Sequence, residues 1–411
     1  MTDSVASENK TKLTPLYARS LIYSFGAGMV GPFTGAYAVE LGASSSDMGW
    51  FQSSADLSNN VMQILWGMFS DKLRRRVPFI VVGGLIVAVL WVPMMFIANA
   101  TQLIILLTVQ ALLGSMVTPA WIALIGDIVP SVKLGRVNAN LNLWALTGSL
   151  IATLISGATM VKTGAQPNEM FFIPLIIASA CGIASSTIMV KVKESKSAGK
   201  VNLKENFAYD ISKIVAYTKE SPDFIKYCYV EGTFHFFMSI AWPLMAITQI
   251  RVLNASMLDI AIFTVVQSIM TIIFQRWAGN FADRVGRKPL LIFSRFSLLT
   301  VPLAYAFSPN MSILTAVSAF WGISNALGQV SMTAYLLDIA PEEYRGSFAA
   351  TFNFVVGITS FFGSLIGGYL SDHVIGVFGL VLGLQIVYMV SFFGRMLSAI
   401  PFLKIRETLK R

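Results

Sequence analysis

Long apolar segments alternate with short polar ones along nearly the whole chain. Twelve of these segments are long enough to form helices that cross a hydrocarbon layer, which takes about 20 residues. They lie at 16–41, 47–69, 77–98, 102–128, 136–162, 169–191, 223–250, 256–278, 288–307, 311–337, 346–370 and 377–403. None has the strict apolar–polar alternation of a membrane β-barrel. The pattern predicts an all-α integral membrane protein with twelve transmembrane helices.

The composition supports this prediction. Charged residues make up 12% of the chain and hydrophobic residues 55%, whereas about 25% of the residues of a typical soluble domain are charged. The net charge of +9 is compatible with nucleic-acid binding. The basic residues, however, cluster in the loops between apolar segments, where they can face anionic lipid. We therefore expect membrane lipids as partners, and no nucleic acid.

The basic residues also predict how the chain is oriented. All Lys and Arg residues except Lys162 and Arg251 fall on one side of the twelve-helix layout. Basic loops stay in the cytoplasm, so both termini are expected there, in a multi-pass protein of the plasma membrane. Residues 1–15 are polar and lack the apolar core of a cleavable signal peptide. Cys181 and Cys228 lie inside apolar segments, and we expect no disulfide.

Several features of the first half recur in the second. A charged hairpin at 67–76 has a second copy at 279–289. The other repeated features are Asp127-Ile128-Val129-Pro130 with Asp338-Ile339-Ala340-Pro341, Arg136 with Arg345, Pro32 with Pro243, and Pro93 with Pro302. An even number of helices per half gives both copies the same orientation in the membrane.

The repeat predicts three parts: a six-helix bundle at 1–191, a cytoplasmic linker at 192–222 and a second six-helix bundle at 223–411. Within the linker, apolar residues recur at helical spacing, namely Leu203, Phe207, Ile211 and Ile214. This spacing favours an amphipathic helix on the membrane surface. A disordered basic linker is the alternative.

With its duplicated hairpin and its twelve spans, the chain resembles the major facilitator superfamily. In that family the hairpin after helix 2 reads Gly-x-Leu-Ala-Asp-Arg-x-Gly-Arg-Lys, and a degenerate copy follows helix 8. Here the second copy is nearly complete, whereas in the first Arg74 replaces the second glycine. The resemblance implies two six-helix bundles related by pseudo-two-fold symmetry and transport by alternating access. Signatures of the drug antiporters are largely missing, since Gln110 stands where they have an arginine.

The resemblance also implies a conformational latch at the two hairpins. Asp71 and Asp283 would each meet the N-terminus of a helix in the opposite half, where a carboxylate satisfies free N–H groups. The neighbouring arginines would bridge to nearby carboxylates. The predicted latch residues are Gly67, Asp71, Arg75, Gly279, Asp283, Arg284, Gly286 and Arg287. The alternative is a solvated positive loop that only sets topology.

Helix 7 carries two ionisable residues, Glu231 and His235, one turn apart on the same face. Glu231 lies about 12 Å from the cytoplasmic start of the helix, near the middle of the membrane. An ionisable group is unfavourable there and usually has a function. We predict that Glu231 carries the coupling proton, with His235 as its partner. A structural pair that fixes helix packing is the alternative.

Helix 2 has a polar stripe formed by Gln52, Asp56, Asn59 or Asn60, and Gln63. Such a stripe faces a wet cavity or polar neighbours. Asp56 could bind a cationic group, pair with a basic side chain, or carry the proton instead of Glu231. A hydrogen-bond ladder between helices is the alternative.

Aromatic and amide side chains on several helices suit an amphiphilic solute. The predicted cavity residues are Asn59, Gln63, Gln110, Trp121, Trp242, Trp321, Asn325 and Gln329. Four arginines lie toward the cytoplasmic helix ends and are expected to extend to the surface, namely Arg19, Arg276, Arg295 and Arg395. Arg19 and Arg395 could instead reach an anionic substrate. Asp47 and Asp259 are expected at the outer N-termini of their helices.

Together these patterns predict a secondary active transporter that moves a small organic solute, with proton coupling. The alternatives are an uncoupled facilitator of the same fold, or a membrane sensor or channel that does not transport by alternating access. No enzyme site, metal-ligand cluster or cofactor motif is recognisable, and we expect a monomer. The substrate and the direction of transport are left open.

Overall fold

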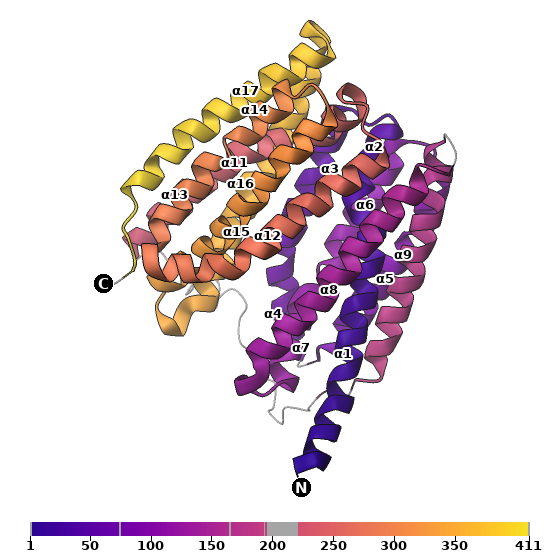
Figure 1. Cartoon of the computed structure of the whole chain (residues 1–411), viewed down its shortest axis with the longest axis vertical. Coiled ribbons are helices and arrows are strands. Elements are labelled where there is room, and N and C mark those ends of the chain that lie inside the picture. Colours follow the sequence, from indigo (N-terminus) through magenta and orange to yellow (C-terminus); the bar gives the residue numbers. More distant parts are fainter. Residues whose placement is uncertain (1, 74, 164–165, 193, 195–220, 410–411) are drawn as a thin grey trace. The chain divides into compact units, whose positions relative to one another are not determined.

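The computed structural model describes residues 2–73, 75–163, 166–192, 194 and 221–409, and this part of the chain is helical without a β-strand (Figure 1). Ten helical stretches in it are long and apolar enough to cross a membrane. The predicted first span is interrupted: α1 (Thr2–Val30) continues through η1 (Gly31–Phe33) into α2 (Thr34–Glu40). The second likewise runs from α3 (Ser45–Leu57) through η2 (Ser58–Met62) into α4 (Gln63–Leu73). The helices account for all twelve predicted spans.

The other elements follow the predicted order. Those before the linker are α5 (Val77–Leu90), η3 (Pro93–Phe96), α6 (Ala100–Gly114), α7 (Val117–Ile128), α8 (Ser131–Met160) and α9 (Pro167–Val190). Those after it are α11 (Pro222–Ile247), η4 (Thr248–Val252), α12 (Met257–Val285), α13 (Arg287–Ser297), α14 (Thr300–Phe307), α15 (Met311–Ile339), η5 (Glu342–Tyr344), α16 (Arg345–Phe378), α17 (Leu380–Ala399) and η6 (Ile400–Lys404). The amphipathic helix predicted within 192–222 lies outside the described residues.

The hairpins are more helical than the sequence suggested. The predicted second and eighth spans end at 69 and 278, but α4 continues to Leu73 and α12 to Val285. Asp71 and Asp283 therefore lie in the last turns of helices, and not at the start of a loop. Hydrophobicity marks only the part of a helix that lies in the hydrocarbon, whereas backbone hydrogen bonding carries the helix further into water.

Contacts divide the chain into two compact units. Unit 1 contains Met1–Gly42, Met62–Leu203 and Ser256–Ala261, and unit 2 contains Ala43–Val61, Lys204–Ala255 and Ile262–Arg411. The first part of the second span, α3, thus packs with the C-terminal helices. The predicted bundle limits at 191 and 223 stay a prediction.

In unit 1, α1 packs along α8 and α9. Hydroxyl groups of α8 tie it to α1, because Ser156 donates to the Met29 carbonyl at 2.6 Å and Thr153 to the Gly28 carbonyl at 3.1 Å. Gly148 of α8 lies so close to α1 that a Cβ there would be 2.7 Å from the Leu21 carbonyl oxygen. Small residues and interhelical hydrogen bonds hold these helices together, as is usual in membranes.

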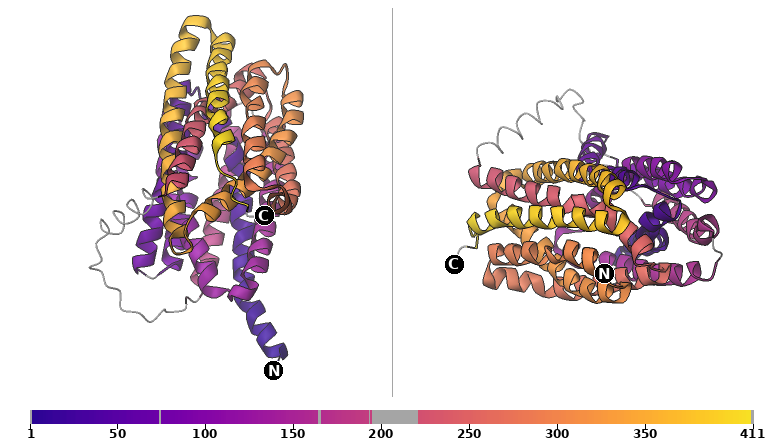
Figure 2. Two further views of the ribbon diagram at one scale, coloured as in Figure 1. Left: turned by 90° about the vertical axis from the view of Figure 1, so that its left-hand side faces the viewer. Right: turned by 90° about the horizontal axis from the view of Figure 1, so that it is seen from above.

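In unit 2, α11 packs against both α16 and α17 (Figure 2). Gly363 and Gly367 of α16 face the backbone of α11, and a Cβ on either one would overlap the carbonyl oxygen of Phe236 or Ile240. Ser391 of α17 donates to the Phe237 carbonyl at 2.7 Å. Glycines thus bring α16 into backbone contact with α11, which positions the ionisable residues of α11.

Helix α3 is fixed to α16 at its N-terminus. Asp372 of α16 accepts hydrogen bonds from the backbone N–H groups of Ser45 at 2.8 Å and Ser46 at 2.9 Å. Lower on the helix, Ser53 donates to the Phe361 carbonyl at 2.8 Å. The carboxylate satisfies N–H groups that have no partner inside the helix and complements the helix dipole.

The structure confirms Asp47 and Asp259 as N-terminal caps of their helices, whereas the side of the membrane on which they lie stays a prediction. Asp47 and Ser44 form a capping box at the start of α3. At the start of α12, Asp259 accepts hydrogen bonds from the backbone N–H of Ser256 at 2.9 Å and from its hydroxyl at 2.7 Å. The same spacing of serine and aspartate therefore caps both helices.

Candidate functional site

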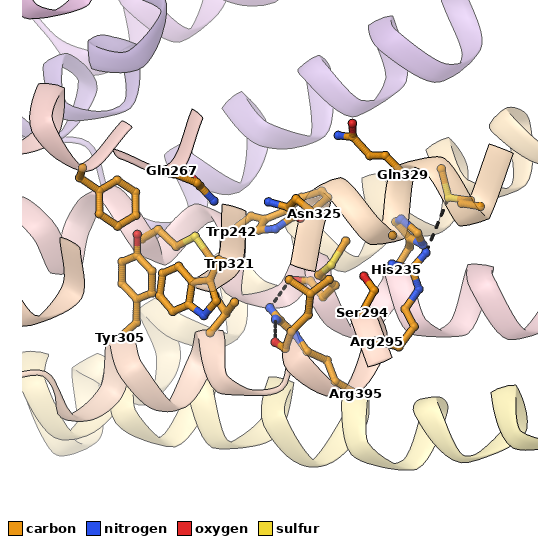
Figure 3. A pocket seen from close by; sticks show the side chains of 17 residues that line it. His235, Trp242, Gln267, Ser294, Arg295, Tyr305, Trp321, Asn325, Gln329 and Arg395 are labelled. Carbon is orange, nitrogen blue, oxygen red and sulfur yellow. Dashed lines mark hydrogen bonds between the residues drawn. The ribbon is translucent and has the colours of Figure 1, made fainter. Parts of the chain in front are cut away.

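A cavity of about 430 Å³ lies within unit 2 (Figure 3). Its walls come from α11, α12, α13, α14, α15 and α17. Four of the predicted cavity residues line it, namely Trp242, Trp321, Asn325 and Gln329. The side chain of Trp321 is fixed, because its indole N–H donates to the Thr300 hydroxyl at 2.9 Å. The volume falls in the range of about 300–1,000 Å³ that is typical of small-molecule sites.

Glu231 is completely buried in the wall of α11. Both of its carboxylate oxygens accept hydrogen bonds from Nη2 of Arg295, at 2.8 and 2.9 Å. Nδ1 of His235 lies 3.4 Å from the same carboxylate and 2.9 Å from the Glu231 carbonyl oxygen, which it can contact only as a donor. The predicted pair of Glu231 and His235 is therefore a group of three, with Arg295 as the charged partner of Glu231.

Arg295 does not extend to the membrane surface as predicted. It is only 5% exposed and lines the cavity. Its guanidinium carbon also lies 5.2 Å from the ring centre of Phe234 and 5.6 Å from that of Phe402. The prediction was wrong because the partner, Glu231, is on another helix. A guanidinium can stay buried when it pairs with a carboxylate and contacts the faces of aromatic rings.

Arg395 also differs from the prediction. It is 1% exposed, and its Nη1 donates to the Leu298 carbonyl at 2.9 Å and its Nη2 to the Met238 carbonyl at 3.0 Å. Nε donates to the Ser391 hydroxyl at 3.1 Å. Figure 3 shows Arg395 between the aromatic residues Trp321 and Tyr305 on one side and Arg295 on the other. The guanidinium therefore lies in the wall of the cavity.

Arg19 is likewise buried, in unit 1, and does not extend to the surface. Its guanidinium carbon lies 3.9 Å from the ring centre of Trp121 and 5.1 Å from that of Tyr23. The stacking on Trp121 is a cation–π contact between α1 and α7. Arg276, by contrast, is exposed on α12.

Asp56 is buried in unit 2 with polar neighbours on both sides. One carboxylate oxygen lies 3.3 Å from the amide nitrogen of Gln52, which donates to it, and the other accepts from the Ser364 hydroxyl at 3.2 Å. The backbone next to Asp56 changes to the π-helical turn η2. These contacts fit the predicted alternative of a hydrogen-bond ladder, and no arginine or lysine is paired with Asp56 in the described part of the chain.

The other predicted cavity residues lie apart from this cavity. The Gln110 amide donates to the Val87 carbonyl at 3.0 Å, which holds α6 against α5. Asn59 is exposed, Gln63 is half-buried, and Trp121 receives Arg19. Their role in solute binding stays a prediction.

The two hairpins form matching ion-pair clusters. Arg76 pairs with Asp71 at 2.6 Å and lies 3.5 Å from Asp127. Arg287 pairs with Asp283 at 3.0 Å and Asp338 at 3.2 Å. The repeated Asp127 and Asp338 are therefore the nearby carboxylates to which an arginine bridges.

Arginine use in the first hairpin differs by one residue from the prediction. The side chain of Arg75 is exposed, and the next residue, Arg76, makes the ion pairs. In the second copy, Arg287 makes them as expected, while Arg284 is exposed. The first hairpin has Arg74 in place of the second glycine of the motif. The motif alone therefore did not predict which arginine of this hairpin forms the ion pairs.

Two glutamates that the sequence analysis missed cap the helices after the hairpins. Glu194 accepts hydrogen bonds from the N–H groups of Arg76, at 2.6 Å, and Val77 at the start of α5. Glu407 accepts from the N–H groups of Arg287 and Lys288 at the start of α13, at 3.0 and 3.1 Å. A repeated segment contains both, Lys191-Val192-Lys193-Glu194-Ser195 and Lys404-Ile405-Arg406-Glu407-Thr408. That repeat is the signal that could have found them.

The Glu407 cap also explains a glycine of the hairpin. Gly286 has a φ of +112°, a conformation that other residues rarely adopt. A Cβ at this position would also lie 2.5 Å from a carboxylate oxygen of Glu407. Gly286 is therefore needed both for the turn and for the approach of the carboxylate.

We expect replacement of Glu407 by Gln to destabilise the N-terminal end of α13 by about 1 kcal/mol at neutral pH. Burial raises the pKa of Glu407, but N–H donors from Leu409, Arg287, Lys288 and Thr408 outweigh it and hold the pKa below its usual value. The stabilisation is thus complete above the unfolded pKa of about 4.3 and is lost as the pH falls through the lower folded pKa. Thermal unfolding of both proteins between pH 7 and pH 3 measures it.

The control for this comparison is replacement of the exposed Glu342 by Gln, for which we expect little change at any pH. A difference between the wild type and the Glu407 variant that stays constant down to pH 3 would show that the carboxylate charge is not responsible.

No group of three or more metal-ligating side chains occurs within the described ranges.

Comparisons with known proteins give the family. The Major Facilitator Superfamily profile matches residues 17–220 and 230–408. An uncharacterised MFS-type transporter of Methanocaldococcus jannaschii is 23% identical, over 85% of this chain and 86% of its own length. Multidrug resistance protein MdtG of Proteus mirabilis is 26% identical over 77% of this chain and 78% of its own.

Solved structures show the same fold. A mutant of the nucleoside transporter NupG covers 96% of this chain and 99% of its own, with a TM-score of 0.78 and 14% identity. A D-xylose–proton symporter covers 98% of both chains, with a TM-score of 0.70 and 13% identity. At these identities the likeness concerns the fold alone. The twelve-helix architecture expected from the sequence is confirmed, and the chain belongs to the Major Facilitator Superfamily, a family of multi-pass membrane transporters.

Proposed function

We propose that this protein is a proton-coupled secondary active transporter that moves a small organic solute by alternating access. The observation that carries the proposal is the position of the Glu231–Arg295–His235 group beside a cavity of solute size. Arg295 and His235 line the cavity themselves, so a solute bound there would lie next to the ionisable groups. This proximity supports coupling between solute binding and protonation within unit 2.

The depth of Glu231 supports a role in coupling. The span that holds it runs from Pro222 to Val252, and at about 1.5 Å per residue Glu231 lies about 13 Å along it. Carboxylates at this depth are rare and usually functional. When Glu231 is ionised it neutralises Arg295, and when it takes up a proton it releases that charge to the cavity. Protonation and solute binding would thereby influence each other.

Asp56 is a second candidate for the proton. It is buried and hydrogen-bonded only by uncharged groups, Gln52 and Ser364, within the described residues. Such a carboxyl can exist in either protonation state without disrupting an ion pair. Glu231 remains the first candidate, because its partners line the cavity.

The hairpins would serve as the cytoplasmic latch. Asp71 and Asp283 are already aligned by their arginines, which also contact Asp127 and Asp338. An aspartate held in this way can meet the N-terminus of a facing helix when the cytoplasmic side closes. In this proposal the two predicted bundles, 1–191 and 223–411, are the bodies that move. The protein is a monomer in the plasma membrane, and both ends of its chain lie in the cytoplasm.

Proteoliposomes with an imposed proton gradient test the function. A pH-sensitive dye inside the vesicles would report proton movement when each member of a panel of sugars, nucleosides, amino acids and organic acids is added. We expect at least one solute to drive proton flux in the wild type, and Glu231→Gln to abolish that flux. Solute uptake that is equally fast with and without the gradient would favour the uncoupled facilitator, in which Glu231 and Arg295 only fix helix packing.

A further inference from the structure

The buried guanidinium of Arg395 differs from that of Arg295 in having no carboxylate partner among the residues that the structure describes. Its three hydrogen bonds go to the carbonyl oxygens of Leu298 and Met238 and to the Ser391 hydroxyl. All three are uncharged acceptors. A buried positive charge that is solvated only by neutral dipoles is unfavourable unless an anion compensates it.

The hydrogen-bonding capacity of Arg395 is also incompletely used. A guanidinium has five N–H groups, and the three bonds occupy one each on Nε, Nη1 and Nη2. One N–H on each terminal nitrogen is therefore left for another partner. Two such donors suit the two oxygens of a carboxylate, or those of a related oxyanion.

The location of Arg395 points to a ligand as this partner. Arg395 lines the cavity together with Arg295, and no aspartate or glutamate is among the lining residues. Glu231 lies behind Arg295 and neutralises it. The wall thus has an excess positive charge at Arg395, near Met238 in the middle of the span Pro222–Val252.

The remaining walls describe the rest of the ligand. Trp242, Trp321 and Tyr305 provide aromatic surface, and the rings of Tyr305 and Trp321 stack with 5.9 Å between their centres. Asn325 and Gln329 add amide groups that can donate or accept hydrogen bonds. Flat aromatic walls favour an apolar or aromatic body attached to the anionic group.

We propose that the cavity binds organic anions, with the anionic group on Arg395 and an apolar or aromatic body against Trp242 and Trp321. This inference rests on the proposed transport function and specifies its substrate class. Entry of one anion compensates Arg395. If one proton were transported together with the anion, their charges would cancel. The loaded cavity would then have the same net charge as the empty one.

Binding to the purified protein at a single pH tests the inference without any gradient. Fluorescence of the tryptophans and thermal stability would be followed during titration with matched pairs, benzoate with benzamide and indole-3-acetate with indole-3-acetamide. Phosphate and chloride serve as anions without an organic body. We expect at least one carboxylate to bind tenfold or more tightly than its amide and than either inorganic ion.

The variants assign the effect to Arg395. Arg395→Gln should reduce carboxylate affinity by at least tenfold, and Arg395→Lys, which keeps the charge but loses the fork of donors, should fall between Gln and the wild type. Arg276→Gln is the matched control, since it removes an exposed arginine outside the cavity, and it should bind like the wild type. If Arg395→Gln does not fold, the Lys variant and the matched pairs still decide the question.

Four results would overturn the inference: amides that bind as well as carboxylates, no binding of any carboxylate, phosphate or chloride that binds as tightly as the carboxylates, or full carboxylate affinity in the Arg395 variants. Failure of proton coupling is separate. A protein that prefers carboxylates through Arg395 but ignores the pH gradient supports the anion site and contradicts coupling.

Discussion

Replacing Glu231 with Gln is expected to destabilise the protein by about 3–5 kcal/mol. The substitution leaves Arg295 buried with no carboxylate, because Glu231 provides both oxygens that its Nη2 contacts. Breaking one side of a buried ion pair costs more than removing the whole pair. Unfolding of the purified protein by denaturant, followed by fluorescence, measures the loss.

The double variant Glu231→Gln, Arg295→Met separates stability from coupling. With both charges removed we expect most of the lost stability to return, because no unpaired charge remains in the core. Proton-driven uptake should stay absent in both variants. Glu342→Gln is the control, since this glutamate is exposed and lies 3.6 Å from Arg345 in a surface ion pair. A double variant as unstable as the single one would mean that Glu231 has a structural role beyond neutralising Arg295.

Replacing Gly367 with Ala is expected to cost about 1–3 kcal/mol, since the added methyl group would overlap the Ile240 backbone of α11. Either α16 moves away from α11 or the crossing is strained. Both outcomes disturb the helix that carries Glu231 and His235, so uptake should fall as well. Thermal unfolding and transport assays on the same preparation measure the two effects.

Gly376, on the same helix, provides a matched control. Among the residues that the structure describes, none outside the adjoining turns of α16 would lie within 4 Å of a Cβ there. Alanine is the better helix former by up to about 1 kcal/mol, so Gly376→Ala should be neutral or stabilising. Equal losses at both positions would show that helix propensity or flexibility, and not the contact with α11, determines the effect at Gly367.

Much of the fold could be predicted from the sequence, because apolar length and the position of basic residues are local properties. The twelve spans and their order follow from apolar length, and the caps follow from the acidic residues Asp47 and Asp259 at the starts of two spans. Helix ends were less predictable. The last turns of α4 and α12 lie beyond the apolar segments of the sequence. They can be recognised only from the backbone hydrogen bonds of the structure.

The site was predicted in part. A buried carboxylate on α11 stands out by itself, and Glu231 and His235 were recognisable from their spacing of one turn. The partner Arg295 was not, since its distance from a helix end suggested a surface position. Which residues of two helices face one another depends on how the helices cross, and no local pattern contains that information.

The ion pair and Arg395 have no counterparts in the first half of the chain. Aligning Pro32 with Pro243 places Ser20 at the position of Glu231, and aligning Pro93 with Pro302 places Ile86 at that of Arg295. Aligning Glu194 with Glu407 places Gly182 at that of Arg395. The turns and caps thus recur in both halves, whereas these charges occur at the matched positions of the second half alone. Substitutions confined to the second half can therefore change the charge of the cavity while the turns and caps common to both halves stay the same.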